Sequence, residues 1–163
     1  MKIMNLLQLI SKNNLLKFSL VFITIFFISL NAQSEIPEKY KIESSLKKCK
    51  GTDYRKWNNC YGEYKFPRIE YKGEWNNGNF HGKGVLKEAW GGIYFGDFKN
   101  NLAHGYGRQD EVDGTWWEGE VKNDYLTGKG KYFFPSTKCL YEGIFLKMAL
   151  NGEGKISCEG GYE

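Results

Sequence analysis

The stretch YKGEWNNGNFHGKG, which runs from Tyr71 to Gly84, places Tyr71, Gly73 and Trp75 at alternate positions before an Asn-rich segment. Alternation with period two predicts a strand whose alternate side chains share one face. The Gly-containing segment NNGNFH and the second run GKGVL predict a turn and a returning strand. Glycine is a poor strand residue, so its place beside large aromatic residues needs a packing explanation.

The same pattern returns three more times along the chain. Units begin at Tyr71, Tyr94, Trp117 and Tyr141, at intervals of 23, 23 and 24 residues. Such a period predicts a repeat architecture rather than a single globular core. A degenerate copy precedes them, in which Cys49 takes the tyrosine position. The shared positions are Gly73, Gly96, Gly119 and Gly143; Gly82, Gly105, Gly128 and Gly152; Gly84, Gly107, Gly130 and Gly154; and the aromatic residues Trp75, Phe98 and Phe145.

The pattern Y-x-G-x-[W/F]-x-N followed by G-x-G resembles the MORN repeat (membrane occupation and recognition nexus). Val121, Lys147 and Trp117 depart from it without changing the register. The resemblance implies an all-β fold: an elongated, single-layer antiparallel sheet of successive β-hairpins. In larger proteins such arrays accompany catalytic domains, and here the repeats fill nearly all of the chain that follows the N-terminal segment.

The first 34 residues have the marks of an export signal. Lys2, Lys12 and Lys17 precede a 13-residue apolar run, residues 18–30, and small residues follow it. This favours a signal peptide cleaved after Ala32 or Ser34, and an uncleaved signal anchor is the alternative. The predicted organisation is a signal at 1–34, a linker or short helix at 35–48 and a repeat array at 49–163, with units of about 49–70, 71–93, 94–116, 117–140 and 141–161.

The charge balance argues against nucleic acid as a partner. The chain has 23 basic and 19 acidic residues, and removal of the three lysines of the signal leaves 20 against 19. No basic stripe remains to neutralise a phosphate backbone.

The glycines suggest a register for each hairpin. In a regular hairpin the residue numbers of opposed positions have a constant sum. If Gly73 lies opposite Gly84, Trp75 therefore lies opposite Gly82 and Tyr71 lies opposite Leu86. The Trp75 ring would then face a residue without a side chain. On the other face the same register opposes residues of opposite charge, which supports it. These predicted pairs are Glu74 with Lys83, Glu120 with Lys129, Glu118 with Lys131, and Glu142 with Lys155.

Four cysteines follow the apolar run, which favours disulfides in an exported protein. The hairpin register places Cys139 opposite Cys158, and Cys49–Cys60 follows by elimination, with a distorted first unit. Zinc is the alternative, but its usual close Cys pairs are missing because ten and eighteen residues separate these cysteines.

Candidate chemistry is scarce. His81 and His104 occupy equivalent positions in successive units, roughly 9–10 Å apart by strand spacing, which is too far for one metal ion. Carboxylates opposite lysines stay ionised on an exposed sheet and lack the apolar pocket of a general acid. We therefore expect no catalytic, cofactor-binding or metal-binding residues, and no small-molecule substrate.

The sequence thus predicts a non-catalytic exported module, periplasmic or secreted, that binds an unknown protein partner or acts as a scaffold at the cell envelope. Its expected surface is the sheet face with exposed aromatic residues, such as Trp90, Trp116 and Phe133. A membrane-lipid-contacting module is the alternative, although a near-neutral chain offers anionic lipid little attraction. An enzyme or accessory subunit with a site on the sheet face is the less favoured third choice.

Overall fold

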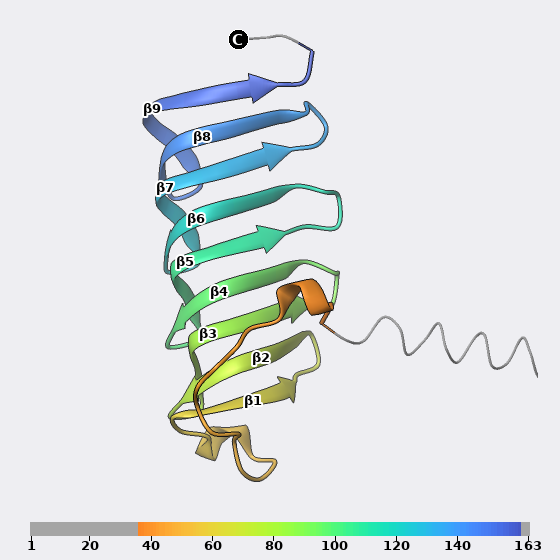
Figure 1. Ribbon diagram of the computed structural model, residues 1–163, viewed down its shortest axis with the longest axis vertical. Helices are drawn as coiled ribbons and strands as arrows, with labels where there is room; N and C mark the ends of the chain where they lie inside the picture. The colour runs from red at the N-terminus through yellow and green to blue at the C-terminus, as the bar shows by residue number, and fades with distance from the viewer. Residues whose placement is uncertain (1–35, 161–163) are drawn as a thin grey trace, which may run out of the picture. The chain divides into compact units, whose positions relative to one another are not determined.

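The computed structural model describes residues 36–160, so the predicted signal segment lies outside the described residues. One sheet of nine antiparallel strands, β1 to β9 in sequence order, accounts for most of this region (Figure 1). The predicted single open sheet of successive hairpins is confirmed. The strands are β1 (Cys60–Lys65), β2 (Ile69–Asn76), β3 (Asn79–Glu88), β4 (Ile93–Lys99), β5 (Leu102–Asp110), β6 (Trp116–Lys122), β7 (Tyr125–Phe134), β8 (Cys139–Leu146) and β9 (Ala149–Cys158).

Two-residue turns close four of the hairpins. Both turn residues have positive φ, for example 50° at Asn77 and 73° at Gly78, as a type I′ turn requires. The second turn residue also binds the preceding hairpin: Asn101 accepts from the Phe80 amide at 2.8 Å, and Asp124 accepts from the Ala103 amide at 2.7 Å. Successive hairpins are therefore joined through their turns as well as through their strands.

One glycine of every strand lies opposite a glycine of the next strand. We call this row the glycine column. It places the backbones of neighbouring strands close together, because a Cβ added at Gly73 would lie 2.6 Å from the Gly84 Cα. Its members are Gly62, Gly73, Gly84, Gly96, Gly107, Gly119, Gly130, Gly143 and Gly154.

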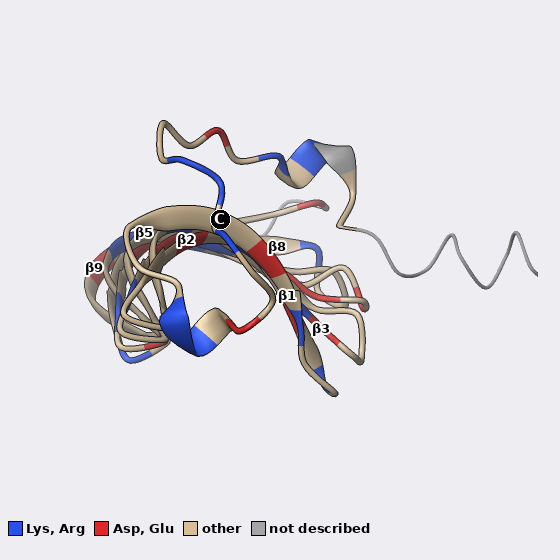
Figure 2. Cartoon of the chain, turned by 90° about the horizontal axis from the view of Figure 1, so that it is seen from below, with Lys and Arg blue, Asp and Glu red and all other residues tan. Residues whose placement is uncertain are grey.

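The sheet is curved, and the 3-10 turn at residues 54–56 lies on its concave side (Figure 2). The hydrophobic core, which includes Trp57 next to this turn, lies on the same side. Tyr71, which is fully buried, lies over Gly84 and stacks on Phe80 with 3.9 Å between ring centroids. Its hydroxyl donates to the Glu74 carbonyl at 2.9 Å, and burial raises its pKa far above the ordinary value. Tyr94 occupies the same place over Gly107 in the next repeat. The glycine column thus makes room for tyrosine rings.

The prediction that Trp75 lies opposite Gly82 is wrong. The register shifts after Gly73, so that Trp75 lies opposite Phe80 and Glu74 lies opposite His81. The cause is a β-bulge in the returning strand, where Gly82 has a φ of +57°. The indole of Trp75 instead donates to the Gly62 carbonyl of β1 at 3.0 Å.

The same shift overturns two of the four predicted charge pairs. Lys83 lies opposite Asp97 of β4 and binds it at 2.6 Å instead of facing Glu74. Glu120 falls within the shift between β6 and β7, so it does not oppose Lys129. Glu118 does oppose Lys131, Glu142 does oppose Lys155, and Tyr71 does oppose Leu86.

The segment 38–48, which we call the strap, crosses the convex face of the sheet (Figure 2). It begins with a 3-10 turn, η1 (Glu38–Tyr40), and ends at a parallel bridge between Lys48 and Tyr61. Tyr40 is buried against Phe95 at 5.0 Å between ring centroids, and its hydroxyl donates to Asp110 at 2.7 Å. This contact spans 70 positions of sequence, which sequence patterns did not indicate.

The docking of the strap is expected to weaken in acid. Burial raises the pKa of the Asp110 carboxyl, but hydrogen bonds from Tyr40 and Arg108 outweigh it and hold the pKa below its ordinary 3.8. A lowered pKa stabilises the docked state above the ordinary value, and this is lost as the pH falls through the folded-state pKa. We expect the nuclear Overhauser effect between Tyr40 and Phe95 to disappear below pH 3.8, before that between Trp57 and Trp75. Simultaneous loss of both would instead mean global unfolding.

Candidate functional site

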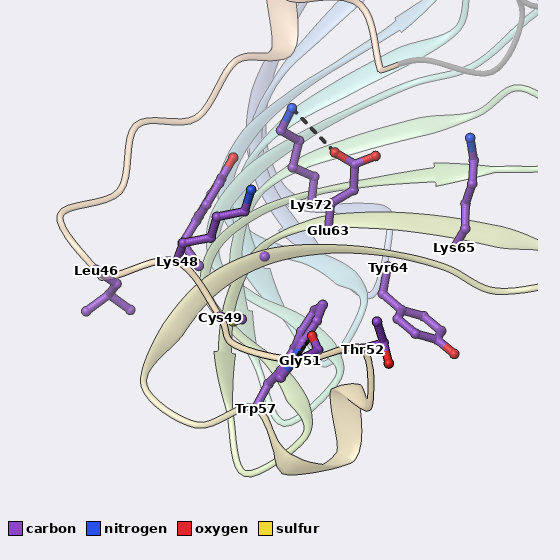
Figure 3. Close-up of a pocket in the computed structure, with 12 residues that line it drawn as sticks. Leu46, Lys48, Cys49, Gly51, Thr52, Trp57, Glu63, Tyr64, Lys65 and Lys72 are labelled. Atoms are coloured by element: carbon purple, nitrogen blue, oxygen red, sulfur yellow. Dashed lines mark hydrogen bonds and ion pairs between the residues drawn. The ribbon is translucent and has the colours of Figure 1, made fainter.

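A groove of about 730 Å³ lies at the outer edge of β1 (Figure 3). One wall is the chain from Leu46 to Thr52, and the other is β1 itself, with Trp57 between them. The residues that line it are Leu46, Lys48, Cys49, Gly51, Thr52, Trp57, Tyr61, Gly62, Glu63, Tyr64, Lys65 and Lys72.

The wall formed by residues 46–52 is fixed by a disulfide and by a tryptophan. Cys49 and Cys60 are bonded, with 4.9 Å between their Cα atoms. The Trp57 indole donates to the carbonyls of Lys50 and Gly51 at 3.1 and 3.2 Å. Gly51 has a φ of +73°, a conformation that favours glycine where the chain turns away from β1.

Trp57 joins this wall to the hydrophobic core. It follows a 3-10 turn, η2 (Tyr54–Lys56), whose N-cap Asp53 accepts from the Arg55 amide. The indole is 7% exposed and meets Trp75 edge-on, with 5.0 Å between centroids. The groove therefore has a rigid base, because Trp57, which lines it, is part of the core.

The backbone of β1 faces the groove at alternate residues. The Tyr61 amide donates to the Lys47 carbonyl at 2.9 Å, and the Tyr61 carbonyl accepts from the Cys49 amide at 2.8 Å. Antiparallel pairing with β2 alternates along β1, so Glu63, two residues on, directs its N–H and C=O the same way. Beyond Gly51 the wall has turned away, so this part of the edge faces the groove.

Lysines predominate among the charged groups of the groove. Lys72 pairs with Glu63 at 3.6 Å, and Lys65 pairs with Glu70 at 3.3 Å outside the lining. Lys48 is exposed on the opposite wall. Burial raises the pKa of Tyr61, although nearby Lys72 lowers it, so the phenol remains a neutral donor. The lining thus carries three cations and one anion.

The repeat residues singled out from the sequence do not line this groove. Their aromatic members belong to the core, and their glycines form the glycine column and the bulges. Both cysteine pairs are bonded as the register and elimination predicted, Cys139–Cys158 with 4.0 Å between Cα atoms. The distortion expected in the first unit takes the form of a single strand, β1, with Cys49 on a segment that pairs with it in parallel.

The three predicted aromatic residues do not form one surface. Trp116 and Phe133 stack on the convex face at 5.8 Å, and the Arg108 guanidinium lies 4.2 Å from the centre of the Trp116 ring. Trp90, 61% exposed, lies apart in the turn between β3 and β4. The Nδ1 atoms of His81 and His104 are buried and, within the described residues, have no hydrogen-bond partner.

Sequence reasoning missed Lys48, Trp57, Glu63 and Lys65 as members of a site. The available signal was the segment WNNCYG, residues 57–62, which repeats the WNN of residues 75–77 without a complete hairpin before it. Residues 36–160 contain no group of three or more His, Cys, Asp or Glu arranged to hold a metal ion. Within the same range no helix has the length and apolar character to cross a membrane.

Comparison with known families identifies the repeat. The family model of the MORN repeat matches residues 71–92, 94–116 and 117–137. None of the curated proteins matches the chain. The three matched segments correspond to the hairpins β2–β3, β4–β5 and β6–β7 with the segments that follow them. Residues 71–137 therefore consist of three consecutive MORN repeats.

Proposed function

We propose that this protein is a non-catalytic interaction module that binds an extended, acidic segment of a partner protein in the groove beside β1. MORN repeats are commonly protein- or membrane-interacting modules and are generally non-catalytic. The observation that carries the proposal is the edge of β1, where the Glu63 backbone points into a groove rimmed by lysines.

An extended segment suits this edge because it can add to the sheet as another strand. Main-chain hydrogen bonds then give affinity, and pockets for alternate side chains give specificity. The segment would take the place that residues 47–49 occupy beside Tyr61, displaced along β1 toward Glu63 and Lys65. Trp57 and Tyr64 offer an apolar surface for one face of that segment.

Acidic residues suit the other face of the bound segment. Lys48, from the chain at residues 46–52, and Lys72, from β2, both line the groove (Figure 3). An acidic side chain bound there would meet both ammonium groups. The one acidic lining residue, Glu63, pairs with Lys72, and the lining keeps a net charge of +2. A basic segment would lose these contacts and would meet like charges instead.

The partner is expected at the cell envelope or outside the cell. The two disulfides are consistent with an oxidising compartment, where such bonds persist. The basic and apolar N-terminal segment supports export, either with cleavage or as a membrane tether. The module would then hold an envelope protein through its extended segment.

The substitution Lys48→Glu tests the charge of the groove. We expect it to weaken binding of a short peptide that alternates Glu and Val about fivefold to tenfold, because an attraction becomes a repulsion. The matched control is Lys129→Glu, an equal charge change on β7 far along the sheet, which should leave binding unchanged. Fluorescence anisotropy of the labelled peptide measures both.

The site of binding is checked by amide chemical shifts. The peptide should shift the amides of Glu63 and Lys65, and a peptide that alternates Lys and Val should not. Shifts confined to the convex face near Trp116 would contradict the groove. If the protein floated with phosphatidylglycerol vesicles, and Lys48→Glu floated as much as wild type, this would favour a membrane surface as the partner instead.

A further inference from the structure

The two edges of the sheet differ in how they are covered. Tyr61 of the β1 edge pairs with the chain at residues 47–49. Within the described residues, β9 pairs with β8 alone. Residues 149–156 of β9 are all exposed. Such an edge is a template for pairing with another strand.

The backbone groups that β9 presents outward can be identified. Cys139 and Cys158 lie directly opposite each other with 4.0 Å between Cα atoms, which is typical of a pair without mutual backbone hydrogen bonds. The neighbouring amide of Glu159 donates to Lys138 at 3.1 Å, as the alternation requires. Counting back in twos from Cys158, the N–H and C=O groups of Ile156 and Gly154 point away from β8.

We propose that β9 pairs with β9 of a second copy of this chain, antiparallel, about a two-fold axis that passes through Gly154. The proposal is independent of the groove at β1, since it concerns the opposite edge. The axis at Gly154 lets the outward N–H and C=O of Gly154 bond to those of Gly154 in the second copy. It also continues the glycine column from one chain into the next, so the close backbone spacing of the sheet is kept.

The charges of β9 select the same register. With Gly154 on the axis, Glu153 faces Lys155 of the second copy and Lys155 faces its Glu153. A shift of one residue per chain in one direction places Glu153 opposite Glu153, and in the other direction Lys155 opposite Lys155. Like charges directly opposite destabilise a sheet, so only the register centred on Gly154 is complementary at these positions.

The pairing would also cover apolar surface. Ile156 is 47% exposed and lies on the concave side of the sheet, opposite Tyr141. In the proposed register Ile156 faces Gly152 of the second copy, which has no side chain to obstruct it. An isologous interface of this kind closes with two chains, since the edge strand of each is used up.

Charge reversal tests the register directly. Sedimentation of the oxidised chain should show a monomer–dimer equilibrium. Glu153→Lys and Lys155→Glu should each weaken the dimer on the order of tenfold to a hundredfold, because each opposes like charges at two symmetric positions. Both side chains are exposed, so folding of the monomer should be retained.

Mixing the two variants provides the decisive control. The Glu153→Lys chain has a cation at both positions of the pair, and the Lys155→Glu chain has an anion at both, so the mixture should recover a heterodimer. The variant Ile156→Pro, which removes an outward N–H, should also dissociate the dimer. Mixing it with either charge variant should not restore a dimer. A wild-type chain that stays monomeric at submillimolar concentration, an open series of larger species, or a dimer that Glu153→Lys leaves unchanged would overturn the proposal.

Discussion

The substitution Gly84→Ala is expected to lower the free energy of unfolding by about 2–3 kcal/mol, the usual cost of overpacking. The added methyl group would fall within the ring of Tyr71, with Cζ at 2.6 Å. The ring cannot move away, because Tyr71 is fully buried and stacks on Phe80 at 3.9 Å. Thermal unfolding should show a midpoint about 10 °C lower.

The matched control is Gly130→Ala, at an equivalent position of the glycine column. There the nearest atom to the new methyl is a Leu126 Cδ at 2.8 Å, the end of an aliphatic side chain rather than a stacked ring, and the next is the Glu118 carbonyl oxygen at 3.0 Å. Its cost should therefore be clearly smaller than that of Gly84→Ala. Equal costs at both positions would mean that the glycines are needed for backbone reasons alone, and the ring-packing explanation would fail.

The repeat period predicted successive hairpins in a single sheet because each regular unit is built the same way. The positions Tyr71, Gly73 and Gly84 are fixed by local spacing, and their register follows from two facing glycines. The prediction of the Cys139–Cys158 pair worked for the same reason, since it lies on the regular side of Gly143. Opposed positions can be predicted from residue numbers wherever the pairing of the two strands has no β-bulge.

The bulge was beyond this reasoning because the two glycines of G-x-G were given one role. In β3 they have two: Gly84 leaves space for the Tyr71 ring, and Gly82 adopts a φ of +57°. The equivalents Gly105, Gly128 and Gly152 have φ values of 98°, 104° and 91°. A sequence shows glycine in both cases, and it does not separate a need for space from a need for left-handed backbone.

The groove could not be predicted because it arises where the repeat fails. Its walls come from the degenerate first unit and from the end of the strap, neither of which has a periodic pattern. Cys49 and Cys60 were visible as a pair, but the sequence did not indicate that Trp57 would be held by the carbonyls of Lys50 and Gly51. Contacts of that kind depend on tertiary structure.

Removal of the Cys49–Cys60 disulfide is expected to cost about 3 kcal/mol, as for other loops of this length. In the variant with Cys49→Ala and Cys60→Ala, the chain at residues 46–52 loses its covalent link to β1. That segment is then held to β1 by the backbone hydrogen bonds of Tyr61 and by the contacts of its carbonyls with the Trp57 indole. Urea unfolding, monitored by tryptophan fluorescence, should show this loss of stability. A reductant should not destabilise this end of the sheet further, because the variant has no Cys49–Cys60 bond left to reduce.

The other disulfide provides the comparison, because it lies at the far end of the repeat array. In a repeat protein each unit contacts its neighbours only, so the effect of Cys139→Ala with Cys158→Ala should stay near β8 and β9. We expect amide exchange to rise in residues 139–158 and the groove amides of Glu63 and Lys65 to be unaffected. The Cys49–Cys60 variant should show the reverse pattern. If either variant raised exchange equally along all nine strands, the sheet would unfold as one cooperative unit, and independent stabilisation of its two ends would be wrong.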